Sequence, residues 1–317
     1  DGYFTCDRWK MDFSVTDGRL TMSQDSSAPS GFANSLKLDC TTADTSIASG
    51  EILNIQHRIE GQNLQQFAKG TSDAKPFAVS FYVKGNASAT YVCELFDADN
   101  GRQISKTFNV TTDWTRVELS FPADTTGAFD DDNASSLYLL IWLHAGSTYS
   151  SGTLNSSAWA STTNANRAAG ISSFFDSTDR TFFLTGVQLE VGQNATEFEH
   201  EPFERTLLKC QRYYQRWQAA ENYDFVCMGQ MTSDTFWVGM YRLAPEMRGE
   251  PTFSADGTFK VNASGGDMNA SSIQLSRATP QVMGIECTTT DADRIGQGAY
   301  LRAGADSDAF LEFISEL

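Results

Sequence analysis

The sequence predicts an all-β protein built from two domains. Phe, Tyr and Trp make up 12% of its 317 residues, whereas only seven are Pro. Short apolar runs alternate with stretches of Ser, Thr, Asn, Asp and Gly, which is typical of chains with many strands and many turns. The chain is about twice the usual domain length, so we expect two hydrophobic cores.

Eight segments of the first half read as strands that are either alternating or fully apolar. In one of them Leu53, Ile55 and His57 share a face, and Asn54 and Gln56 lie on the other. The eight segments are residues 35–39, 52–59, 77–83, 90–96, 104–110, 114–121, 137–143 and 181–191. About eight such strands favour a two-sheet jelly-roll β-sandwich, which we assign to residues 1–200.

Residues 201–219 are predicted to form a connecting helix. Its clear helical pattern, the one such pattern in the sequence, covers residues 203–217. Pro202 suits its start, and nearby glutamates complement the positive end of the helix dipole. Spacings of three and four place an apolar stripe on one face, formed by Phe203, Leu207, Cys210, Tyr214 and Trp217. A basic stripe lies opposite, formed by Arg205, Lys209, Arg212 and Arg216. The apolar stripe either packs on a sheet or contacts another subunit, and the basic stripe is either solvated or meets an acidic neighbour.

Strand-like runs resume after the helix, at residues 225–231, 236–240, 258–262, 282–287, 299–303 and 310–314. They predict a second, smaller β-sandwich domain over residues 220–317. No internal repeat of fixed period is found, which argues against a β-helix.

The formal charge of −17 disfavours nucleic acid and anionic membranes as partners. The longest apolar run, residues 137–143, is far shorter than a membrane span, so we expect no membrane insertion. The six cysteines are widely spaced, with no pair separated by two residues, and are expected to be reduced.

Catalytic motifs are not found, so the sequence predicts a protein that is not an enzyme. The three histidines, His57, His144 and His200, are isolated and read as structural. A pair of carboxylates for glycoside hydrolysis stays open, since sequence spacing does not fix their separation in space.

The acidic segment DADNG offers one candidate metal site. Asp97, Asp99 and Asn100 resemble the opening of a Ca²⁺ loop, but the closing Glu is missing. The same residues, followed by Gly101, spell a hairpin turn, which we favour. No other cofactor is predicted.

A long polar stretch at residues 145–173 is the most promising binding surface, because loops of this length inside a domain are usually functional. Tyr149 and Trp159 either stack on sugar rings or anchor the loop to its own sandwich. Both interpretations stay open.

Three segments, residues 58–86, 121–139 and 182–214, resemble a module of tail-fibre and other virion structural proteins of tailed bacteriophages. The block from GVQLEVG to QRYY is the most distinctive, and the opening GYFTCDRWKM is similar as well. The resemblance covers residues 2–217, and residues 244–253 and 298–317 resemble the C-terminal β domain that often follows this module.

The resemblance implies a jelly roll similar to carbohydrate-binding modules, a small β-sandwich after it, and a homotrimer without a known active site. It carries over no functional residues, and it favours a scaffold role for residues 151–170. It implies a structural virion component on the particle surface, assembled in the bacterial cytoplasm with other virion proteins and attaching to host glycans. The alternatives are a capsid decoration or head-fibre protein, and a glycan-degrading tailspike enzyme.

Overall fold

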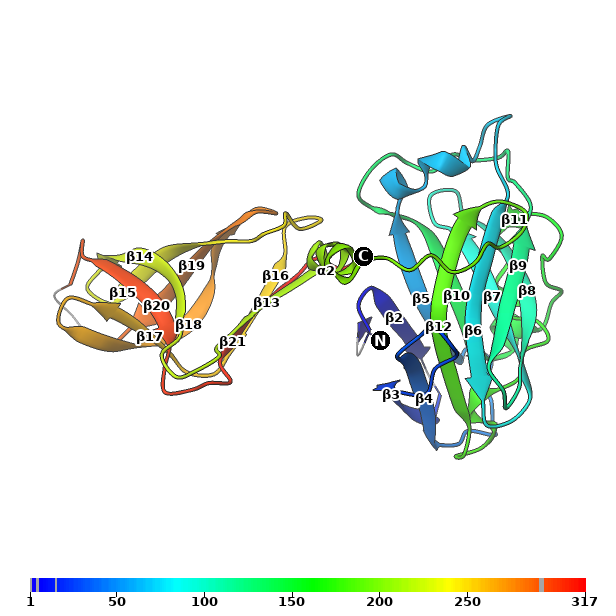
Figure 1. The fold of residues 1–317 in the computed structure, drawn as a ribbon, viewed down its shortest axis with the longest axis horizontal. Coiled ribbons are helices and arrows are strands. Elements are labelled where there is room, and N and C mark those ends of the chain that lie inside the picture. Colours follow the sequence, from blue (N-terminus) through cyan, green and yellow to red (C-terminus); the bar gives the residue numbers. More distant parts are fainter. Residues whose placement is uncertain (1, 4–5, 15, 291–293) are drawn as a thin grey trace. The chain divides into compact units, whose positions relative to one another are not determined.

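The computed structural model describes residues 2–3, 6–14, 16–290 and 294–317. It is nearly all β, with 49% of residues in strands and 8% in helices, which confirms the predicted fold class. The chain forms two compact units, residues 1–200 with Leu317 and residues 201–316 (Figure 1). No helix within the described ranges is long and apolar enough to cross a bilayer.

Two antiparallel sheets face each other in the first unit (Figure 1). The seven-stranded sheet has the order β1 (Gly2–Tyr3), β2 (Trp9–Ser14), β5 (Ile52–Glu60), β10 (Ser135–Ala145), β7 (Ala89–Asp97), β8 (Arg102–Val110) and β11 (Ala160–Ser161). The five-stranded sheet has the order β3 (Arg19–Asp25), β4 (Ser35–Thr42), β12 (Thr181–Val191), β6 (Phe77–Gly85) and β9 (Thr115–Phe121).

The strand pairing of this unit is that of a jelly roll. β4 pairs with β12, β5 with β10, β6 with β9, and β7 with β8, all antiparallel. The chain therefore forms one long hairpin with its tip between β7 and β8, and successive pairs of that hairpin alternate between the two sheets. These eight strands are the eight predicted from the sequence, and β2 and β3 extend the two sheets beyond them.

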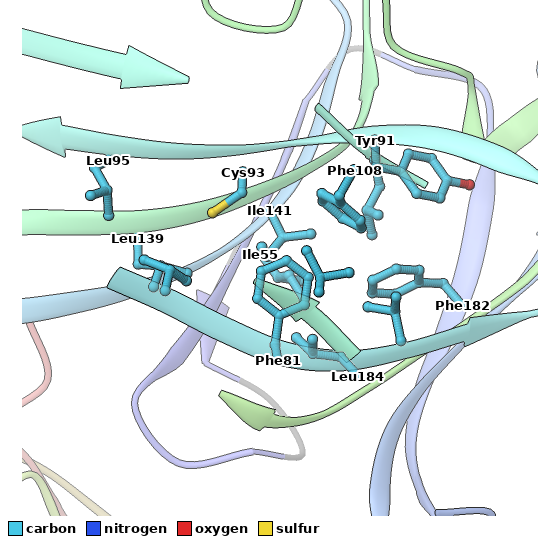
Figure 2. Packing of buried hydrophobic residues seen from close by; sticks show 14 of the residues in the cluster. Ile55, Phe81, Tyr91, Cys93, Leu95, Phe108, Leu139, Ile141, Phe182 and Leu184 are labelled. Carbon is cyan, nitrogen blue, oxygen red and sulfur yellow. The ribbon is translucent and has the colours of Figure 1, made fainter. Parts of the chain in front are cut away.

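Alternate side chains of these strands fill the space between the sheets. Leu53 and Ile55 of β5 are fully buried, as are Phe81 and Phe182 of the facing sheet. Figure 2 shows Phe81 and Phe182 among the aliphatic side chains of this core, and the ring of Phe81 lies 5.0 Å from that of Phe108. Each such side chain contributes roughly 1.5–3 kcal/mol on burial, so this core is a main source of the unit's stability.

Residues 146–173 fold back over the outer face of the seven-stranded sheet. They include α1 (Ser147–Ser150), β11 and η3 (Asn164–Asn166), and η4 (Phe174–Asp176) follows. A second, smaller core forms beneath them around Val92, Leu140 and Trp142. Glu94 is buried there and accepts hydrogen bonds from the Trp142 indole at 2.6 Å and from Arg167 at 2.9 Å. The long polar segment is therefore a packed cover of the sheet.

In the second unit, six strands close into a barrel. Their order is β14 (Phe225–Ser233), β15 (Phe236–Arg242), β19 (Val282–Thr289), β18 (Gly266–Ala278), β17 (Phe259–Ala263) and β20 (Gly298–Ala303). Closure is completed by β20, which pairs with both β14 and β17. A three-stranded sheet adds β13 (Tyr214–Gln218), β21 (Phe310–Ile314) and β16 (Thr252–Asp256). The predicted strands of this β domain are present, and they form a barrel with an added sheet where two stacked sheets were expected.

The helix of this unit is shorter than predicted. α2 covers Phe203–Gln211, and the chain is a strand again from Tyr214. Tyr214 and Trp217 therefore do not continue the helical stripe, and the prediction of one helix over residues 203–217 is wrong for residues 212–217. The reason is long-range: Tyr214 pairs with Ile314 and Trp217 with Leu311, near the end of the chain. Local periodicity does not reveal such a partner.

Candidate functional site

A cleft of about 520 Å³ opens between the two sheets of the jelly roll. Trp9, His57 and Leu139 line it from the seven-stranded sheet, and Leu184 and Leu189 line it from the five-stranded sheet. Its volume falls within the roughly 300–1,000 Å³ range of small-molecule sites. It is thus the candidate functional site of the first unit.

The cleft lies where the inward-facing side chains of β5 change from aliphatic to polar. Leu53 and Ile55 fill the core, but the next inward position is His57, which the sequence alternation placed on this face. On the opposite wall, β12 carries a bulge between Thr185 and Gln188, and Gly186 within it has a φ of +60°. A bulge shifts which residues face inward, so both Leu184 and Val187 line the cleft.

Trp9 and His57 form the aromatic part of the wall. They lie opposite each other on β2 and β5, with ring centroids 5.3 Å apart in an edge-on arrangement. Burial, reinforced by the nearby charge of Arg8, lowers the pKa of His57 from 6.5 to about 3. The imidazole is therefore neutral at pH 7 and offers one donor and one acceptor.

The remaining polar lining consists of uncharged groups and one arginine. Gln24, Asn34, Ser35 and Thr185 line the cleft. Arg8 also lines it, and its Nε lies 2.7 Å from the Asp7 carboxylate. The residues that line the cleft in the described part of the chain include no Asp or Glu.

This arrangement suits binding better than catalysis. Apolar and aromatic walls with neutral donors and acceptors match a ligand that has apolar faces and many hydroxyl groups. Among the lining residues that the structure describes, none forms a carboxylate pair for general acid and base catalysis. Burial, together with the charge of Asp7, raises the pKa of the Cys6 thiol in the lining, which disfavours the nucleophilic thiolate.

Trp159 lies outside the lining of this cleft and is buried. Its ring is only 7% exposed, packs 5.5 Å from the ring of Phe77, and donates an indole hydrogen bond to the Pro122 carbonyl at 2.9 Å. Tyr149 is partly buried and rests on Trp142, with ring centroids 5.5 Å apart. Both residues anchor the long segment to the sandwich, which is the second of the two interpretations given above.

The DADNG segment is the hairpin turn at the tip of the jelly roll, between β7 and β8. Asp97 is buried and accepts hydrogen bonds from Lys69 at 2.5 Å and from the backbone N–H of Asn100 at 3.0 Å. Asp99 accepts from the N–H of Asp130 at 3.0 Å. The favoured interpretation, a hairpin turn, matches this geometry, and Ca²⁺ binding by these residues stays an untested alternative in which the Lys69 ammonium would compete for Asp97. In the described ranges, no group of three His, Cys, Asp or Glu side chains is placed to bind a metal ion.

The predicted contact stripes are divided between the helix and β13. On α2, Phe203 and Leu207 are 77% and 42% exposed, and Cys210 is half-buried. Of the basic residues, Lys209 pairs with Glu201 at 2.5 Å, and Arg216 of β13 pairs with Glu312 at 3.2 Å. Arg205 is exposed on α2, and Arg212 follows its last turn. A subunit contact through this helix stays a prediction.

One buried series of side chains, Ser173, His144 and Glu51, has the order of groups found in some hydrolases. Ser173 Oγ lies 2.8 Å from His144 Nδ1, and Glu51 Oε2 lies 2.9 Å from His144 Nε2. A nucleophile, a base and an orienting carboxylate follow this order in hydrolases. However, His144 is fully buried, and Ser173 Oγ accepts the N–H of Phe175 at 3.0 Å. The series ties Ser173, at the end of the covering segment, to His144 of β10 and to Glu51, which directly precedes β5.

Sequence reasoning missed most of the cleft. Trp9 and Gln24 lie on β2 and β3, neither of which was predicted as a strand, and Asn34 precedes β4. His57 was visible as an isolated histidine on an otherwise apolar strand face, but the sequence analysis read it as structural. A polar residue at an inward position marks either a satisfied core group or a site, and here it marks the cleft.

No family model matches the sequence, and no curated protein matches it. Solved structures give weak similarities over the jelly roll. A CBM4 carbohydrate-binding module shares 11% identity over 59% of this chain and 88% of its own, with a TM-score of 0.33. A family 11 carbohydrate-binding module from Clostridium thermocellum, in complex with a mixed-linked tetrasaccharide, shares 11% over 63% of this chain and 95% of its own, with a TM-score of 0.32.

The enzymatically active domain of tailspike protein 4 from bacteriophage CBA120 shares 12% identity over 58% of this chain, with a TM-score of 0.32. The match spans only 19% of that tailspike chain. Identities and TM-scores this low say nothing about which ligand the present chain binds.

Proposed function

We propose that this chain is a non-enzymatic structural component of a tailed-phage appendage, and that its jelly roll binds host-surface glycan in the cleft. The observation that carries the binding role is the composition of the cleft: its described lining residues combine the Trp9 and His57 rings with uncharged polar groups and Arg8, and they include no carboxylate. The virion role rests on the sequence resemblance of residues 2–217. A trimer and contacts with other virion proteins belong to the same proposal.

Trp9→Ala tests the binding site. We expect at least a tenfold loss of affinity for the bound glycan in isothermal titration calorimetry, because removing about 1.4 kcal/mol of aromatic contact weakens binding tenfold. Trp114→Ala is the matched control, since Trp114 lies outside the cleft lining and its ring packs 6.1 Å from that of Phe183. Thermal unfolding of both variants verifies that they are folded. Loss of binding in Trp114→Ala alone would refute the assignment.

The non-enzymatic role is tested separately, with a reducing-sugar assay on host lipopolysaccharide and capsule. We expect no turnover, because no carboxylate lines the cleft in the described part of the chain. Turnover that a single carboxylate substitution abolishes would show a glycan-degrading enzyme. A side-chain-resolution map of the intact particle would place the chain on a tail appendage or, against the proposal, on the capsid.

A further inference from the structure

Some polar side chains of the cleft already form hydrogen bonds within the described part of the protein, and others do not. The Ser35 hydroxyl donates to the Ser27 carbonyl at 2.6 Å, and the Thr185 hydroxyl donates to the Asn34 carbonyl at 3.0 Å. Within the described ranges, no hydrogen bond involves the side-chain amide of Gln24 or of Asn34, or the ring nitrogens of His57. Two amides and one imidazole are therefore the groups most available to a ligand.

These groups have the hydrogen-bonding character of sugar hydroxyls. An amide and a neutral imidazole each carry both a donor and an acceptor, and a hydroxyl can donate to one while accepting from the other. A carboxylate or a sulfate only accepts, so it would leave the acceptor half of each group without a partner. His57 is half-buried and Gln24 and Asn34 are exposed in the free chain, so the cost of about 1–3 kcal/mol for an unmatched polar group applies to those that the ligand covers completely.

The charges near the cleft also disfavour an acidic ligand. Arg8 is the one arginine among the described lining residues, and its Nε lies 2.7 Å from the Asp7 carboxylate. The low pKa of His57, about 3, keeps its ring from supplying a positive charge at pH 7. The chain as a whole carries a formal charge of −17, which repels anions at long range. A buried anion without a new cationic partner is costly.

We infer that the cleft selects uncharged sugar residues and rejects uronic, sialic and sulfated ones. The inference rests on the proposed glycan-binding function and specifies its ligand class. The donors and acceptors of Gln24, Asn34 and His57 would bind hydroxyl groups, while Leu139, Leu184 and Trp9 would contact the apolar face of the ring.

The test uses the full chain and pairs of ligands in which one member is acidic and the other has the same sugar backbone with the acidic groups esterified or absent. The pairs are oligogalacturonate and its methyl ester, a hyaluronan fragment and its methyl ester, and sulfated and unsulfated galactose oligomers, together with neutral hexose and pentose oligosaccharides. We expect calorimetry to give the neutral member of a bound pair at least a tenfold higher affinity. The affinity for neutral ligands should also change little with added salt, since no ion pair forms.

Gln24→Lys tests whether the selection arises in the cleft. The added ammonium should weaken binding of the neutral member and strengthen binding of the acidic member of the same pair. Gln66→Lys is the matched control, because Gln66 is exposed, belongs to the same unit and lies outside the cleft lining. It adds the same charge without entering the site and should leave the preference unchanged.

The outcomes separate the two proposals. A wild-type preference for acidic members would overturn the neutral selectivity and leave glycan binding in place. Equal effects of Gln24→Lys and Gln66→Lys would also overturn the inference, because selectivity would then follow net charge. Binding of no ligand in the whole panel would overturn the proposed function itself, and the inference with it.

Discussion

Lys69 places a buried ammonium group at the tip of the jelly roll. Its Nζ lies 2.5 Å from Asp97 and 3.2 Å from Asp124, and it donates to the carbonyls of Thr126 and Gly127 at 2.9 and 2.7 Å. The side chains of Lys69 and Asp97 are both fully buried. All these partners are oxygen atoms, so the lysine neutralises a set of ligands that would otherwise suit a hard cation.

Lys69→Met should destabilise the protein by about 3–5 kcal/mol, because it leaves the Asp97 carboxylate buried without its cation. Urea unfolding measures this loss. Lys37→Met is the matched control: it breaks the more exposed pair with Asp39 at 2.8 Å and should cost at most about 1 kcal/mol. Equal losses in the two variants would contradict the structural role of Lys69.

His57 should make stability depend on pH. Its pKa is lowered to about 3 in the folded chain, so protonation favours the unfolded chain. The stability that its neutral form contributes is complete above pH 6.5 and falls as the pH drops toward 3. Cys6 and Arg8 are the other titratable groups in the lining.

We expect the unfolding free energy of the native chain to fall by about 1–2 kcal/mol more than that of His57→Gln between about pH 7.5 and about pH 5. The difference between the two proteins removes the common contribution of the carboxylates. Parallel pH curves would show that His57 is not held neutral. Glycan affinity of the native chain should stay constant over this range, because the ring does not change charge.

The sequence predicted poorly which residues line the candidate site. Trp159 and Tyr149 were candidates for stacking on sugar rings because they lie in a long polar segment, but that segment packs on the sandwich, which buries Trp159 and partly buries Tyr149. Trp9 looked ordinary and lines the cleft. Exposure of an aromatic side chain depends on which distant segments cover it, and no local pattern records this.

At the scale of single elements, the bulge of β12 shapes one wall of the cleft. Gly186 has a φ of +60°, and a Cβ atom there would lie 2.7 Å from the Phe32 ring and 3.0 Å from that of Tyr82. The strand can therefore change its inward side only because this position has no side chain.

Gly186→Ala should lower stability by about 2–4 kcal/mol, since it adds a steric clash to the cost of a left-handed alanine. Gly101→Ala separates the two effects, because Gly101 has a φ of +59° and nothing within 4 Å of the added Cβ. We expect it to cost about 1–2 kcal/mol, from the backbone alone. Chemical denaturation compares the two, and a smaller loss in Gly186→Ala would refute the clash.

Strands with a buried face were predictable, and strands without one were not. The predicted set contains all eight jelly-roll strands, because each alternates or is apolar throughout. It lacks β18, whose residues are mostly exposed, and β16, where exposed and half-buried residues alternate. These strands are defined by their backbone partners, and their side chains carry little of the hydrophobic signal.

At the scale of the whole molecule, all six cysteines are free thiols. Cys40, Cys93, Cys227 and Cys287 are buried, and burial raises the pKa of the last two to about 12. A thiol reagent acts on the thiolate, so these four should react only on unfolding.

Titration with a chromogenic disulfide should therefore label at most Cys6 and Cys210 in the native chain, both of which are half-buried. All six should react in denaturant, without prior reduction. A reductant should leave the melting temperature unchanged. Fewer than six thiols in the denatured, unreduced chain would reveal a disulfide and contradict the structure.

The arrangement of the strands was harder to predict than their existence. The count of eight favoured a jelly roll, which the pairing of β4 with β12 and β5 with β10 bears out. In the second unit the same reasoning favoured two stacked sheets, whereas β20 joins β14 to β17 and closes a ring. Whether six short strands stack or close depends on the tilt and offset between neighbours, which the hydrophobic pattern does not encode.

The hairpin-like pairing of the jelly roll has a consequence for how the chain acquires its structure. β7 and β8 are joined by a tight turn, whereas each pair farther from that turn closes a longer loop. The entropic cost of closing a loop rises with the number of residues it encloses. We therefore expect β7 and β8 to pair first, followed by β6 with β9, β5 with β10 and β4 with β12. Contacts between residues far apart in the sequence form slowly. During synthesis, β4 is therefore made well before β12, the strand with which it pairs.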